Sequence, residues 1–158
     1  MDLMHILING LHLVATVVWI GAIFIHLIVV LPGTREALAQ NPPAYAATIR
    51  SLGTRMVRLV NSAILLIIGT GIYLVLLPDA SPIETVSWEI LLPVKIIVVA
   101  VMVAIHLCRT RLIAPRIGRL TAGGENEVSN RKLGTWQLRL AWVNCVLGLC
   151  LLFLSPAI

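Results

Sequence analysis

The sequence has 158 residues, of which 59% are hydrophobic and 12% charged, and its formal net charge is +5. Soluble domains are roughly half apolar and about a quarter charged, so this composition excludes an ordinary soluble fold. It predicts an integral membrane protein that is embedded in a lipid bilayer.

Four long apolar segments predict transmembrane helices at about residues 6–31, 57–77, 90–108 and 136–155. A helix needs about 20 apolar residues to cross ~30 Å of hydrocarbon. Lipid offers the backbone no hydrogen-bond partners, and no segment has the alternating pattern of a barrel strand. The predicted fold class is therefore all-α, an integral membrane four-helix bundle that forms a single domain over residues 1–158.

Prolines and glycines predict how the first two helices are bounded. Pro32 is expected to end the first helix, and Pro42 to start an amphipathic lead into the second. The segment 69–71, Gly-Thr-Gly, contains small residues that let helices approach closely. This surface is a candidate for homodimerisation.

The third helix is followed by a basic sequence, which is expected to continue it until Ala122, Gly123 and Gly124 break it. Ser129 is expected to be the N-cap of the last helix.

Basic residues gather on one side of the predicted membrane, with eleven in the two loops there. They are Arg35, Arg50, Arg55, Arg58, Arg109, Arg111, Arg116, Arg119, Arg131, Lys132 and Arg139. Basic residues in short loops stay in the cytoplasm, so both termini and residues 78–88 are predicted to be non-cytoplasmic. The pattern favours a multi-pass protein of a bacterial inner (plasma) membrane, beside anionic lipid headgroups, and not a nucleic-acid site.

Histidines repeat along the first helix. His5, His12, Trp19 and His26 are separated by seven residues each. Seven residues turn a helix by about 700°, only ~20° short of two turns, so the four side chains share one stripe. This stripe is expected to face the bundle, since buried imidazole is costly in lipid.

The third helix carries a matching set, because Lys95 and His106 are eleven residues apart and Met102 lies on the same face. Helix rise places His26 and His106 at an inner height, and His12 and Lys95 at an outer height. Alternatively, the Lys95 side chain extends to the interface toward Glu84 or Glu89.

Facing histidines in a helix bundle are typical of a metal or haem site. A b-type haem fits His12, His26 and His106 as candidate ligands, and its propionates fit basic residues at the interface. Those basic residues are Arg55, Arg58 and Arg109.

Two alternatives remain open. Cu(I) favours soft ligands, and Met1, Met4, His5 and Met102 could serve a copper pathway. In the other alternative, the histidines only bridge helices, with Asn9, Asn61 or Asn144 as hydrogen-bond partners.

The residues from His12 through Trp19 and Gly21 to Pro32 resemble the first-helix pattern of the copper-resistance protein D (CopD) family. Trp88, Lys95 and His106 resemble the third-helix pattern of the related HemJ family of haem-binding membrane proteins, which are assigned as protoporphyrinogen oxidases. The resemblance implies that His12 and Lys95 are a functional pair with a catalytic role, and that His106 is a haem ligand.

The predicted function is that of a b-type haem membrane protein in electron transfer, which exchanges electrons with a quinone or a redox protein. Whether the protein is an enzyme, a membrane oxidoreductase, stays open. Copper uptake or resistance, protoporphyrinogen oxidase-like activity and a structural membrane subunit are the alternatives.

Overall fold

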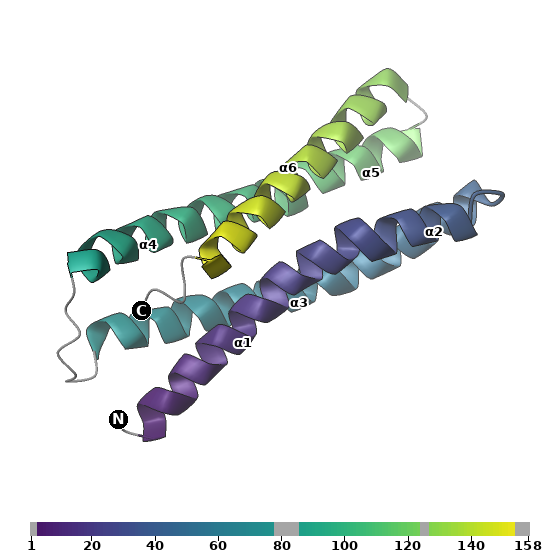
Figure 1. Cartoon of the computed structure of the whole chain (residues 1–158). Helices are drawn as coiled ribbons and strands as arrows, with labels where there is room; N and C mark the ends of the chain where they lie inside the picture. Colours follow the sequence, from purple (N-terminus) through teal and green to yellow (C-terminus); the bar gives the residue numbers. More distant parts are fainter. Residues whose placement is uncertain (1–2, 78–85, 124–126, 154–158) are drawn as a thin grey trace. The chain divides into compact units, whose positions relative to one another are not determined.

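The computed structural model describes residues 3–77, 86–123 and 127–153, and all elements in these ranges are helical (Figure 1). Within these ranges, four helices are long and apolar enough to cross a membrane. They span Leu3–Ala37, Pro42–Leu76, Ile90–Arg119 and Arg131–Phe153. For the described residues, the prediction of an all-helical fold with four apolar helices is therefore confirmed.

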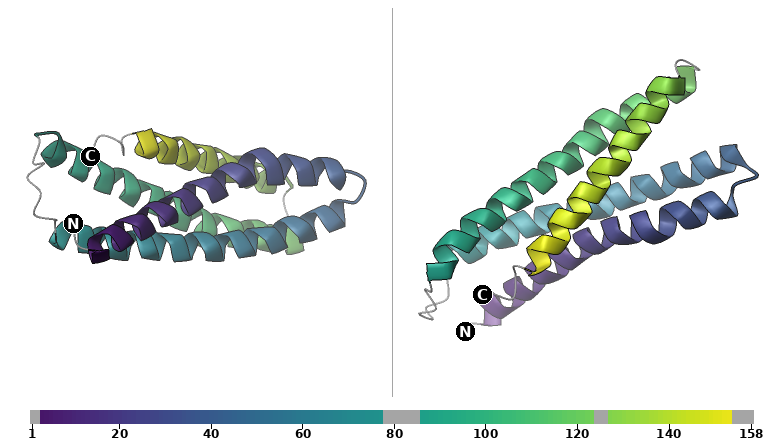
Figure 2. Two further views of the ribbon diagram at one scale, coloured as in Figure 1. Left: turned by 60° about the horizontal axis from the view of Figure 1, so that its bottom comes forward. Right: turned by 45° about the horizontal axis from the view of Figure 1, so that its top comes forward.

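The chain divides into two compact units, Met1–Ile83 and Glu84–Ile158. In the first unit, α1 (Leu3–Ile25) continues through the π-helix η1 (His26–Val30) into α2 (Leu31–Ala37). After a tight turn the chain returns as α3 (Pro42–Leu76), which runs beside α1 in every view (Figures 1 and 2).

The core of the first unit is built from the Trp19 indole and from small and branched side chains of both helices. Its buried members are Ala15, Trp19, Ile20, Ala22, Ile23 and Leu27 on one side, and Val60, Ala63, Ile64, Ile67 and Thr70 on the other. They recur every three or four residues, which is the spacing of one helix face.

The predicted end of the first helix at Pro32 is wrong, since the helix continues to Ala37. Proline cannot donate to the carbonyl four residues before it, here that of Ile28, and its ring clashes with that carbonyl in an α-helix. The chain responds by widening into the π-helix η1, in which the Leu31 N–H donates to the His26 carbonyl. Pro32 then lies in the first turn of α2, where it is tolerated.

The helical segment predicted to precede the second apolar run is confirmed, because α3 begins at Pro42 and continues without a break to Leu76. Asn41 caps this helix, and its side chain accepts a hydrogen bond of 3.1 Å from the Ala44 N–H. The amide oxygen thus satisfies one of the four donors that a helix start leaves open.

In the second unit, α4 (Val86–Leu107) continues through the π-helix η2 (Cys108–Ile113) into α5 (Ala114–Gly123). The basic extension of the third helix is therefore confirmed up to Gly123. The chain returns as α6 (Glu127–Phe153), which packs against α4, η2 and α5. The prediction for Ser129 is wrong, because it lies inside the first turn of α6 and not at its N-cap.

A proline accompanies the second π-helix as well. Pro115 follows η2 at the start of α5, and the Ala114 N–H donates to the Arg109 carbonyl. Each unit thus consists of a long helix with a π-helical segment before a proline, and a returning helix.

Candidate functional site

In the first unit, His12 of α1 contacts the Gly-Thr-Gly segment of α3. The distance from His12 Nδ1 to Thr70 Oγ1 is 2.7 Å, and Thr70 Oγ1 lies 2.5 Å from the carbonyl oxygen of Leu66. A carbonyl can only accept, so the single hydroxyl hydrogen of Thr70 is donated to Leu66. The hydroxyl oxygen must then accept from His12, which assigns the proton of the imidazole to Nδ1.

The other ring nitrogen of His12, Nε2, carries no proton in this tautomer. With the proton on Nδ1, Nε2 keeps its lone pair and can act only as an acceptor or a metal ligand. His12 is half-buried, and no donor to Nε2 is found among the residues that the structure describes. The ring is therefore held by α3 on one side and open on the other.

Gly71 makes room for this ring. A Cβ atom at Gly71 would lie 3.3 Å from His12 Cε1, whereas a Cβ atom at Gly69 would meet nothing within 4 Å. The close approach predicted for these glycines occurs within the chain, between α1 and α3, and uses Gly71. The prediction of a homodimer through this segment is untested, and Gly69 remains the glycine with open space beside it.

The stripe of the first helix lies on its less exposed face. Trp19 is 2% exposed, while His5, His12 and His26 are half-buried. His26 is the first residue of η1, and its Nδ1 atom is buried. π-Helical segments occur frequently at functional sites, which makes the position of His26 notable.

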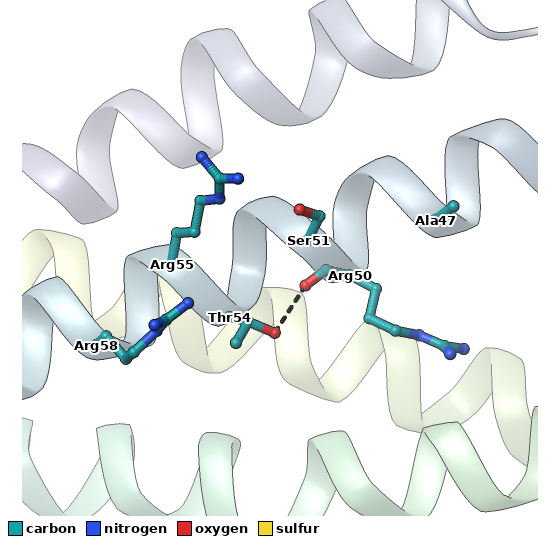
Figure 3. Close-up of a pocket in the computed structure, with 6 residues that line it drawn as sticks. All are labelled: Ala47, Arg50, Ser51, Thr54, Arg55 and Arg58. Atoms are coloured by element: carbon teal, nitrogen blue, oxygen red, sulfur yellow. Dashed lines mark hydrogen bonds between the residues drawn. The ribbon is translucent and has the colours of Figure 1, made fainter.

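Arg55 and Arg58 line a hollow along one face of α3 (Figure 3). The hollow is lined by Ala47, Arg50, Ser51, Thr54, Arg55 and Arg58. The three arginines are exposed, and Thr54 Oγ1 donates to the Arg50 carbonyl at 2.9 Å. These guanidinium groups suit an anion such as a carboxylate or phosphate.

A second basic hollow lies along α6 in the other unit. It is lined by Arg131, Lys132, Thr135, Trp136 and Arg139. The Arg139 guanidinium lies over the Trp136 ring, 6.0 Å from its centre. Exposed tryptophan beside basic side chains is typical of the boundary between lipid and water.

The second unit buries the predicted face of α4. His106 is 4% exposed and Met102 is fully buried, and Lys95 on the same face is half-buried. The Lys95 Nζ atom is buried without a hydrogen-bond partner in the described part of the chain. Glu84 and the side chain of Glu89, its predicted partners, lie outside the described residues and side chains.

Arg109 lies one turn beyond His106, close enough for its charge to act on the imidazole. Its Nε atom is buried and has no hydrogen-bond partner among the described residues. A buried guanidinium donor that lacks an acceptor is costly in a membrane-spanning segment, so this position suits an anionic group.

Asn144 of α6 is a buried polar residue, and the sequence did not predict that its amide lacks hydrogen-bond partners among the described residues. It is fully buried, and neither Oδ1 nor Nδ2 has a partner in the described ranges. His106 precedes Gly123 at the end of α5 by 17 positions, and Asn144 follows Glu127 at the start of α6 by 17 positions. Since the two helices are antiparallel, these side chains lie at a similar height along the second unit.

The structure thus brings together His12 with Thr70 in one unit, and His106 with Arg109 in the other. Within the described residues, no group of three or more His, Cys, Asp or Glu side chains is placed to hold a metal ion. The role of Thr70 was missed because its neighbours suggested helix packing. The available signal in the sequence was the position of Thr70, a polar residue, between two glycines of an apolar helix.

Comparison with known proteins found no match among protein-family models, curated proteins or solved structures. The resemblance to the CopD and HemJ families therefore stays a prediction.

Proposed function

We propose that this chain is a multi-pass membrane protein that binds a b-type haem through His106 and transfers electrons. The observation that carries the proposal is the buried Arg109 Nε, which has no partner among the described residues and lies one turn from the buried imidazole of His106. A haem propionate would supply a carboxylate for this guanidinium, and the haem iron is a metal that an imidazole can ligate.

The donor set supports haem over a metal ion held by protein alone. The porphyrin provides four nitrogens, so the protein needs to add only one or two axial ligands. The large apolar ring suits a membrane interior, and the unpartnered amide of Asn144 offers a further hydrogen bond at the height of His106. When bound, haem supplies one-electron oxidation and reduction of its iron.

His12, His26, Arg55 and Arg58 are the further candidates for this haem protein. His26 is a candidate because helical spacing places it on the same stripe as His12. The exposed arginines Arg55 and Arg58 suit propionates at the interface. The resemblance to the CopD and HemJ families adds Lys95 and His12 as a functional pair. The proposal includes the bacterial inner membrane as location and the non-cytoplasmic side for both termini.

The absorption spectrum of the purified protein tests the proposal directly. We expect a Soret band in the wild-type protein, and loss of haem or a high-spin spectrum in His106→Ala. Arg109→Leu is expected to lower haem retention, whereas Arg111→Leu is the matched control because Arg111 is exposed. Wild-type haem content and a low-spin spectrum in His106→Ala would overturn the assignment.

The same preparation distinguishes the alternatives. Copper in elemental analysis without a Soret band would favour copper uptake or resistance. A protein that contains neither haem nor copper would favour a structural membrane subunit whose histidines bridge helices.

A further inference from the structure

We infer that His12 Nε2 is the hydrogen-bond acceptor of a binding site for a membrane-soluble quinol. The inference rests on the proposed function, because it names the class of molecule that would exchange electrons with the haem. The contacts that support it all lie within the first unit.

The first step is the orientation of the imidazole. Thr70 donates its only hydroxyl hydrogen to the Leu66 carbonyl and therefore accepts from His12 Nδ1. This contact comes from α3, so it holds the ring with Nε2 directed away from Thr70 and ready to accept.

The second step is the environment of Nε2. His12 lies inside the membrane-spanning segment Leu3–Ala37, and its side chain is half-buried. An acceptor in hydrocarbon without a donor is unfavourable, and lipid chains carry no donor. A ligand that satisfies it must be soluble in the membrane and must present a hydrogen-bond donor, and the hydroxyl group of a quinol is such a donor.

The third step separates this site from the haem site. Haem propionates require cationic partners, and the basic residues of the first unit lie from Arg35 to Arg58, on the far side of Trp19 from His12. Thr70 and Gly71, which lie against the His12 ring, are both uncharged, and this fits a neutral ligand.

A photoreactive azidoquinol with a short alkyl tail, kept in its reduced form so that it carries the donor hydroxyl, tests the site in the full chain, reconstituted in lipid nanodiscs. Labelled peptides are identified by mass spectrometry, and a short-tail quinol is added as competitor. We expect labelling on α1 or α3 beside His12, which the quinol suppresses. His12→Ala should reduce labelling about tenfold, the loss expected from one hydrogen bond.

Two variants of Thr70 test the orientation of the ring. Thr70→Val keeps the shape of the side chain but removes the acceptor for Nδ1, so it should weaken competition by the quinol. Thr70→Ser keeps the hydroxyl and should behave as the wild type. Equal quinol competition in Thr70→Val and wild type would overturn the inference.

The outcomes for this site and for the haem are distinguishable. Unchanged labelling in His12→Ala would overturn the quinol site and leave the haem proposal intact. Loss of the haem spectrum in His12→Ala would identify His12 as a haem ligand and also overturn the quinol site. Labelling that depends on His12 in a protein without a Soret band would support the site and overturn the proposed haem function.

Discussion

Gly69 and Gly71 of α3 have different surroundings, so alanine substitutions at the two positions can be compared as a matched pair. Alanine is favoured over glycine in a helix by about 0.5–1 kcal/mol. Gly69→Ala is therefore expected to stabilise the protein, since its Cβ would meet nothing within 4 Å. Gly71→Ala should lose this gain, because its Cβ would lie 3.3 Å from His12 Cε1.

Thermal unfolding of both variants in the same detergent measures the difference. The Gly71→Ala midpoint is expected to lie below that of Gly69→Ala. Equal midpoints would mean that the His12 ring moves away from α3 without cost.

Asn144 provides a second prediction at the scale of one residue. A buried amide without hydrogen bonds costs about 1–3 kcal/mol, and leucine of similar size removes both polar atoms. Asn144→Leu is therefore expected to raise the unfolding midpoint of the protein prepared without haem, as measured by differential scanning fluorimetry.

Asn61→Leu is the control, because Asn61 has an interaction partner in the structure and should lose stability on substitution. A marked fall in the midpoint of Asn144→Leu would show that its amide is bonded in the haem-free protein. The amide would then be unavailable to a ligand.

The elements of both units are longer than the apolar segments that predict them. The start of α3 shows the reason, because Asn41, Pro42 and Pro43 build a helix start well before the first apolar run. Hydropathy detects only the apolar part of a helix, whereas capping and proline determine where the helix begins.

Asn41→Ala is expected to loosen this start. The substitution removes the acceptor of the Ala44 N–H, and loss of an N-cap typically costs about 1 kcal/mol. Hydrogen exchange should become faster at Ala44 and in the first turn of α3, while the buried segment around Ala63 keeps its protection. Asn41→Asp retains the acceptor and should exchange like the wild type.

The sequence predicted the four apolar helices because membrane-spanning helices have a strong and continuous signal. It did not predict the course of the chain at Pro32, since the rule that proline ends helices omits the π-helix, which accommodates the ring. Helical spacing correctly placed Met102 and His106 on one buried face. The bond from His12 to Thr70 could not be predicted, because it depends on the register between two helices, which hydropathy does not encode.

At the scale of the whole molecule, the charge distribution predicts how the chain crosses the membrane. Single cysteines at Ala39, in the turn before α3, and at Leu3, at the start of α1, are expected to lie on opposite sides. The background should lack Cys108, Cys145 and Cys150. In intact cells, an impermeant thiol reagent should label Leu3→Cys alone, and should reach Ala39→Cys only after permeabilisation. Labelling of Ala39→Cys in intact cells would contradict the topology.

The two π-helical segments also determine how the C-terminal extensions of the first and third helices, α2 and α5, are aimed. A π-helical turn holds about one residue more than an α-helical turn, which corresponds to a rotation of about 100°. Residues before and after η1 or η2 therefore cannot be drawn on one helical wheel. Deleting one residue from either segment would swing the arginines beyond it around the helix axis, although the side chains before that segment would keep their places.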